Sequence, residues 1–189
     1  KKRIYGQHKI TTRICSQIMK VHYKLPIKNI SIPNNIVWQE NNNNYKQGAF
    51  VNYTNKNYEH IMQNYVYQKP NPMPEWVDDI LKYFDHFDIV EPSLSKIPAG
   101  KVLPLHRDTF PTFSKIHNIT DLSDIVRYIV FLHDHTPGQL FQIEDTVYSS
   151  WEKGKYLSWT SDQYHAVYNM SNVDRVALQI TCVGKNKVI

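Results

Sequence analysis

The stretch "SKIPAGKVLPLHRD" (residues 95–108) begins the part of the chain that decides the fold. It has a glycine-containing turn, a short apolar run, and then a histidine and an aspartate. Six more short runs follow, each rich in β-branched and aromatic residues and separated by turn residues: VRYIVFL, GQLFQI, TVYSSW, KGKYLSW, HAVYNM and RVALQITCV. Such a series predicts an antiparallel sandwich or barrel of the jelly-roll or cupin kind.

The first half of the chain carries weaker signals. Short apolar runs broken by proline and asparagine, such as "NISIPNNIVW" (29–38), predict strands and loops. From Pro74 onward, apolar residues recur at three- and four-residue spacing, which predicts an amphipathic helix packed on a sheet: Trp76, Val77, Ile80, Leu81, Phe84 and Phe87. We therefore expect a mainly β fold with added helices, in which residues 1–94 support a jelly-roll core at 95–183.

Two features of the N-terminal half have more than one interpretation. "ENNNNYK" (40–46) is low in complexity and is most simply a surface loop. Tyrosines are dense in this half and either line a peptide groove or, as we favour, pack against the fold: Tyr45, Tyr53, Tyr58, Tyr65 and Tyr67.

Bulk composition limits the class of protein. The 189 residues are 41% hydrophobic, which fits one globular domain over 1–189. No apolar run approaches the roughly 20 residues that span a bilayer, and no signal peptide is recognisable. Cys15 and Cys182 form no disulfide framework. We expect a soluble, cytoplasmic protein of microbial or viral origin, in the host cytoplasm if viral.

The net charge of +5 permits an acidic partner. The basic residues are dispersed, however, and no basic cluster is interleaved with aromatic residues. A solvated basic surface is therefore favoured over a nucleic-acid interface.

Three residues in the second half suggest a metal site. Side chains two apart on a strand share a face, so His106 and Asp108 can reach one ion from one side. His165 begins a later strand, which a two-sheet barrel can bring opposite them. Two histidines and one carboxylate with open positions are the ligand set of non-haem Fe(II) oxygenases.

Arg175 lies ten residues after His165, on the next expected strand. A guanidinium there can grip a carboxylate in bidentate fashion. The alternative is a surface ion pair of Arg175 with Asp174 or Asp162. A rival metal pair, "HDH" at 133–135, follows a strand and precedes "TPG", and we interpret it as a turn.

Taken together, these motifs resemble the aspartyl/asparaginyl β-hydroxylase branch of the 2-oxoglutarate- and Fe(II)-dependent oxygenases. The resemblance runs from Ser95 to Val183 and rests on the order of "SKIPAGKVLPLH", "VRYIVFL" and "WEKGKYLSWTSDQYHAVYNMSNVDR". Some animal members have glycine at the position of Asp108. This chain has the aspartate, as do microbial members, which include free-proline hydroxylases.

The resemblance implies a role for each of six residues. His106, Asp108 and His165 would bind Fe(II), and Arg175 would bind the C5 carboxylate of 2-oxoglutarate with help from Ser95. Arg127 would face the other carboxylate of the co-substrate or the substrate. Ser95 is otherwise a turn residue, and Trp151 and Trp159 are expected to pack rather than to contact substrate.

The function that this resemblance implies is hydroxylation of an amino-acid side chain with Fe(II), 2-oxoglutarate and O₂. A peptide or protein substrate is favoured over a free amino acid. One alternative keeps the iron chemistry but acts on a nucleobase or small metabolite. Another is a non-catalytic cupin-like binding module.

Overall fold

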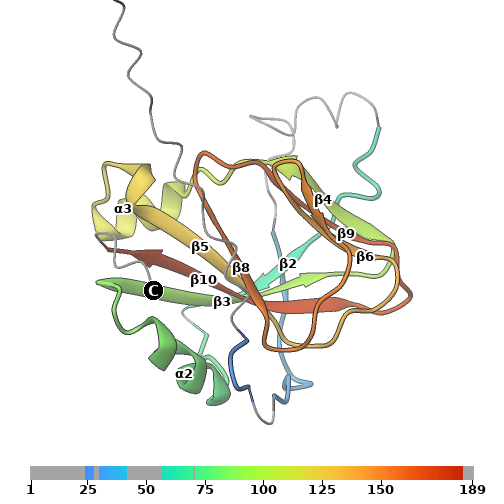
Figure 1. The fold of residues 1–189 in the computed structure, drawn as a ribbon, viewed down its shortest axis with the longest axis horizontal. Helices are drawn as coiled ribbons and strands as arrows, with labels where there is room; N and C mark the ends of the chain where they lie inside the picture. Colours follow the sequence, from blue (N-terminus) through green and yellow to red (C-terminus); the bar gives the residue numbers. More distant parts are fainter. Residues whose placement is uncertain (1–23, 28–29, 42–56, 70, 185–189) are drawn as a thin grey trace, which may run out of the picture.

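The computed structural model describes residues 24–27, 30–41, 57–69 and 71–184 of the chain. Two antiparallel sheets form the fold (Figure 1). The larger sheet has the order β1-β2-β3-β10-β5-β8, and the smaller has the order β4-β9-β6-β7. The strands are β1 (Gln39–Glu40), β2 (Tyr65–Tyr67), β3 (Ile89–Ile97), β4 (Lys101–His106), β5 (Ile125–Phe131), β6 (Gln139–Ile143), β7 (Thr146–Tyr148), β8 (Tyr156–Thr160), β9 (His165–Asn169) and β10 (Arg175–Val183).

The seven strands expected after residue 100 are present as β4 to β10. The strand before them, β3, begins at Ile89, so the core sheet extends upstream of residue 95. Chain neighbours such as β3 and β4 lie in different sheets, and β10 pairs with both β3 and β5. This is the jelly-roll, cupin-like core that the strand pattern predicted.

The space between the sheets is filled mainly by apolar side chains. The larger sheet contributes residues such as Ile129 and Trp159, and the smaller contributes Phe141 and Val167. In an antiparallel sheet, directly paired residues point to the same face. Ala177 pairs with Phe131, and both belong to this inner core.

The outer face of the larger sheet is covered by the predicted helix, α2 (Trp76–Leu81) (Figure 1). Val77 and Ile80 are buried there against Leu178 and Ile180 of β10. The helix is shorter than predicted, because the last turn tightens into the 3₁₀ helix η2 (Lys82–Phe84). The packing role of this helix is confirmed.

Two other short helices follow β4. These are α3 (Pro111–His117) and the 3₁₀ helix η3 (Leu122–Asp124), which leads into β5. Phe110, just before α3, has a left-handed backbone with φ 46° and is nonetheless buried.

Part of the N-terminal half can be compared with its predictions. Tyr67 packs against the outer core and Tyr58 is exposed, whereas Tyr45, Tyr53 and most of the asparagine-rich loop lie outside the described residues. Among the residues described, no helix is both long enough and apolar enough to span a bilayer.

Candidate metal centre

His106 and His165 face each other where β4 ends and β9 begins. The two residues are directly paired, and their ring centroids are 4.2 Å apart. This pairing depends on an irregularity in β4, where two residues separate Leu103 from His106 but only one separates Val167 from His165. The extra residue lies between Leu103 and His106, a stretch that includes Pro104, which has no N–H to lose from the ladder. The bulge therefore places His106 opposite His165.

Asp108 completes the cluster from outside the strand. Because β4 ends at His106, the expectation that alternation along one strand would align His106 and Asp108 was wrong in its reasoning. The carboxylate nevertheless reaches the same place. Its oxygens lie 3.9 Å from Nε2 of His106 and 3.7 Å from Nε2 of His165.

The three ligand atoms all lie within 4.8 Å of one another. Two atoms that each bind an ion at about 2.1 Å are at most about 4.2 Å apart, so a small contraction would let all three coordinate one ion. Two nitrogens and one oxygen suit a divalent transition metal. Within the described part of the chain, this is the one group of three or more such side chains with suitable spacing.

Backbone carbonyls orient both imidazoles. Nδ1 of His106 donates to the Pro104 carbonyl at 2.7 Å, and Nδ1 of His165 contacts the Gln163 carbonyl at 3.4 Å. With hydrogen on Nδ1, each ring turns the lone pair of Nε2 toward Asp108. Burial lowers the pKa of both residues, that of His165 to about 3, so both are neutral and able to bind a metal.

The carboxylate of Asp108 is held in its charged form. Burial alone would raise its pKa, but the Arg127 guanidinium, the two histidines and the Trp159 N–H together hold the pKa below its usual value. Nε1 of Trp159 donates to Asp108 at 3.0 Å, and Nε of Arg127 lies 3.7 Å away. Trp159 packs in the core as expected, but its hydrogen bond to Asp108 was missed.

Arg127 belongs to the same end of the barrel. It pairs across the sheet with Trp159 and Thr181, and its guanidinium lies 4.7 Å from the ring centre of Phe110. Phe110 has the left-handed backbone noted above, and such strained residues concentrate at functional sites. Arg127 thus lies beside the cluster, where it could contact a ligand of the metal.

Arg175 lies toward the other end of the barrel, six residues from Thr181 along β10. Its side chain is 4% exposed, so the surface ion pair with Asp174 or Asp162 does not form. The guanidinium carbon lies 5.4–5.6 Å from the ring centres of Phe131, Phe141 and Trp151. Burial lowers its pKa to about 10, which leaves it charged at neutral pH.

Two nitrogens of this buried cation, Nε and Nη2, have no hydrogen-bond partner among the described residues. They form one edge of the guanidinium, the edge that grips a carboxylate with two parallel bonds. An unpaired buried charge is costly, so this edge is suited to an anionic ligand. Ser95 is buried on the same face, opposite Ala177 and two positions from Arg175.

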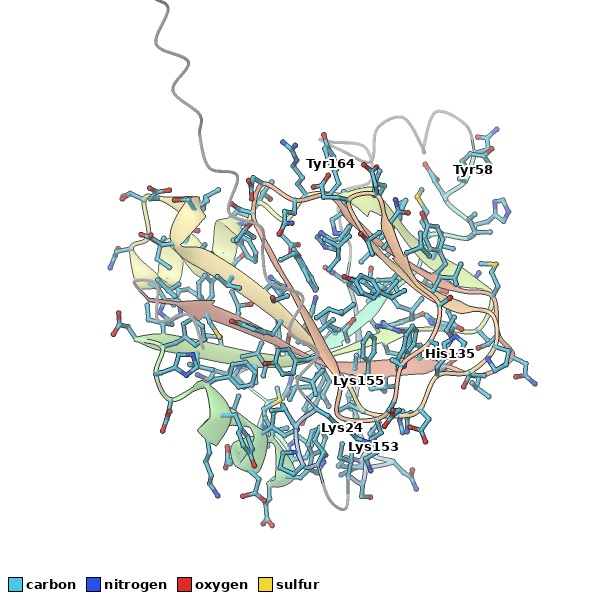
Figure 2. All side chains as sticks on the ribbon, viewed as in Figure 1. Lys24, Tyr58, His135, Lys153, Lys155 and Tyr164 are labelled. Atoms are coloured by element: carbon cyan, nitrogen blue, oxygen red, sulfur yellow. The ribbon has the colours of Figure 1, made fainter. Side chains whose placement is uncertain are left out.

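The rival histidine pair does not assemble a site. His135 contacts the Gln139 carbonyl through Nε2, and Asp134 accepts a bond from the Lys153 backbone. In Figure 2, His135 lies far from Tyr164, the residue before His165. A cavity of about 330 Å³ lies near this turn; Trp151 and Arg175 line it, but none of the three candidate ligands does.

No family model matches the chain, and no curated protein matches it in a sequence search. Among solved structures, it is similar to a prolyl-4-hydroxylase from Pseudomonas putida, with a TM-score of 0.51 and 15% identity over 67% of this chain and 74% of that one. The cupin domain of Cnp3 from Schizosaccharomyces pombe gives a TM-score of 0.40, 8% identity, and coverage of 64% and 65%. A predicted oxalate decarboxylase from Thermotoga maritima gives a TM-score of 0.39 and 11% identity, with coverage of 65% of this chain and 82% of that one.

At these identities the likeness concerns the fold alone. The two sheets, their strand order and the similarity to the Pseudomonas structure agree on the architecture. This protein has a jelly-roll, cupin-like fold with a buried His–Asp–His cluster that could hold a metal ion.

Proposed function

We propose that this protein is a 2-oxoglutarate- and Fe(II)-dependent oxygenase that hydroxylates an amino-acid side chain within a peptide or protein. The observation that carries the proposal is a pairing inside one barrel. A His–Asp–His cluster lies at one end, and a buried arginine with an unpartnered bidentate edge lies toward the other. A chelating diacid needs both features at once.

The residues present fit ferrous iron. His106 and His165 offer neutral nitrogens and Asp108 offers a charged oxygen, and three ligands leave room for a co-substrate and O₂. When bound, the ion would supply the redox chemistry that couples oxidation of the co-substrate to hydroxylation. Fe(II) is favoured over other divalent metals by this donor set, since two histidines and one carboxylate with open positions are typical of non-haem iron oxygenases.

The protein's own contribution is binding, orientation and exclusion of water. Arg175 and Ser95 would hold the distal carboxylate of 2-oxoglutarate, and Arg127 would face its other carboxylate. Trp159 fixes the direction of Asp108. The apolar inner core around Phe141 and Val167 would exclude water from the co-substrate on the side of the smaller sheet.

The proposed substrate is a peptide or protein, and the alternative is a free amino acid. The outer end of the cluster carries Arg107, whose guanidinium lies 4.1 Å from the Tyr164 ring centre. Both residues are exposed beside candidate metal ligands in the chain, and this exposure supports a peptide or protein substrate. Free amino acids, including proline, are the alternative substrates to screen beside peptides.

The test is an anaerobic titration of purified protein with Fe(II) and 2-oxoglutarate, following the visible charge-transfer absorption of the chelate. We expect a saturable band that His106→Ala abolishes and Arg175→Met shifts to higher 2-oxoglutarate concentration. His60→Ala and Lys82→Met are matched controls, because both residues are exposed and Lys82 belongs to η2, which follows the helix on the outer face of the larger sheet. A folded, metal-free preparation that gives no band would overturn the proposal in favour of a binding module.

A further inference from the structure

In a two-sheet sandwich, the residues of a strand that face the other sheet are usually more buried than those that face outward. In β10 the outward-facing residues are the more completely buried. Its outward-facing residues Leu178, Ile180 and Cys182 are each 0% exposed, because α2 and its surroundings cover them. Gln179 faces inward, since it pairs with Ile129 of the inner core, yet it is only half-buried. Ser93, its partner on β3, is half-buried as well. Solvent therefore reaches the inner face of the larger sheet at this level.

This part of the inner face is also chemically different from the rest. Between the sheets, β5, β6, β8 and β9 present mostly apolar side chains, such as Ile129, Phe141, Leu157 and Val167. The paired strands β3 and β10 (Figure 1) contribute Ile97 and Ala177 to this core, but they also present four polar side chains on the same face: Ser93, Ser95, Gln179 and Thr181. A polar stripe inside an apolar barrel is unfavourable unless something pairs with it.

Gln179 occupies a distinct level within this stripe. Thr181, two residues and about 7 Å along β10, is opposite Arg127 at the metal end. Toward the other end, the guanidinium of Arg175 reaches the ring of Phe131, which is opposite Ala177, the inward-facing residue next to Gln179. Gln179 thus lies between the two arginines.

The amide of Gln179 forms no hydrogen bond with the described part of the chain. It can donate two hydrogen bonds and accept others without adding charge. A diacid chelated at the metal end and held by Arg175 has to pass this level, with its distal carboxylate nearest to the amide.

We propose that Gln179 is a co-substrate-positioning residue whose side-chain amide donates a hydrogen bond to the distal carboxylate of 2-oxoglutarate, beside the bidentate edge of Arg175. This inference rests on the proposed function. The amide supplies a hydrogen-bond donor aimed at the carboxylate. A second cationic side chain in its place would bring a further buried positive charge. It also restricts the site to acids that carry a second carboxylate at this distance from the metal.

The test compares two ligands in two variants. Gln179→Glu keeps the size of the side chain but replaces a donor with a negative charge. 2-Oxobutyrate keeps the keto-acid end of 2-oxoglutarate and lacks the distal carboxylate. Gln142→Glu is the matched control, because Gln142 lies on the outer face of β6 and bonds to the Glu144 carbonyl.

Affinities are measured anaerobically from the Fe(II) chelate absorption, with thermal unfolding as a check on folding. We expect Gln179→Glu to weaken 2-oxoglutarate by about tenfold or more and to change 2-oxobutyrate by less than about twofold. Gln142→Glu should change neither. Equal weakening of both ligands, or of neither, would overturn the assignment.

Gln179→Leu keeps the proposal testable if the glutamate variant does not fold. It removes the donor without adding charge, and a several-fold loss confined to 2-oxoglutarate is expected. Unchanged 2-oxoglutarate affinity in this variant would reject the role of Gln179. Failure of the proposed function itself is distinguishable, because the wild-type protein would then give no chelate band with either ligand.

Discussion

Replacing Trp159 with phenylalanine removes the N–H that holds Asp108 while keeping an aromatic ring in the core. The hydrogen bond measures 3.0 Å and its acceptor is a charged, half-buried carboxylate. Loss of a partner that orients a metal ligand typically weakens metal binding about 10- to 100-fold. We therefore expect Trp159→Phe to lower affinity for Fe(II), or for Mn(II) as an air-stable probe, by that factor.

The same substitution also affects stability, so the two effects must be separated. Trp159 is 1% exposed and packs 5.4 Å from Phe141 and 4.5 Å from His165, between ring centres. The smaller ring should lower the free energy of unfolding by about 1–3 kcal/mol. Trp151→Phe is the control, because Trp151 is similarly buried and stacks on Phe131 but does not contact a candidate ligand.

The assay is calorimetric titration of each variant with metal in the absence of co-substrate, beside denaturant unfolding. Both variants should lose stability, and only Trp159→Phe should lose metal affinity. Wild-type affinity in that variant, or an equal loss in Trp151→Phe, would refute the claim that the indole N–H orients Asp108.

Three further changes have distinct expected outcomes. Arg175→Met should weaken 2-oxoglutarate about 100-fold yet stabilise the ligand-free protein by about 1 kcal/mol or more, since it removes an unpaired buried charge; urea unfolding and the chelate titration measure the two effects. Ile80→Ala should cost about 2–5 kcal/mol of unfolding free energy without altering metal affinity, because Ile80 packs on the outer face; a changed metal affinity would show coupling across the sheet. In a Cys15→Ser background, Cys182 should resist thiol reagents at pH 8 until the protein unfolds, because the side chain is 0% exposed and burial raises its pKa to about 12; rapid labelling of folded protein would contradict this.

The sequence was informative where local pattern and tertiary environment agree. Strands β4 to β10 follow runs of β-branched and aromatic residues that are buried between or beneath the sheets, so their positions could be predicted. The expectation that His165 lies close to His106 was also correct, but the two residues meet on neighbouring strands of one sheet rather than across two sheets. The predicted helix ran too far, because the spacing of apolar residues does not reveal where a helical turn tightens.

The parts that could not be predicted depend on contacts between distant segments. The irregularity between Leu103 and His106 sets the pairing of His106, and its position depends on the partner strand β9. The bond from Trp159 joins residues 51 positions apart. Gln179 has no motif around it, and its inward direction is visible only from its pairing with Ile129. Each of these required the register of neighbouring strands.

The charges inside the barrel explain why the two proposed ligands should depend on each other. The negative charge of Asp108 is offset by the positive charge of Arg127, and both histidines are neutral. Glu91 pairs with Lys69. The net charge inside the barrel is therefore the single positive charge of Arg175. One positive charge cannot neutralise the dianion of 2-oxoglutarate, and a divalent ion alone would leave three positive charges in a poorly solvated space. With the divalent ion and the dianion both bound, the net charge of the site is again one positive charge. Each ligand should therefore tighten the binding of the other by the same factor, and titrations in either order must give equal coupling. Independent affinities would mean that the ion and the diacid do not share this barrel.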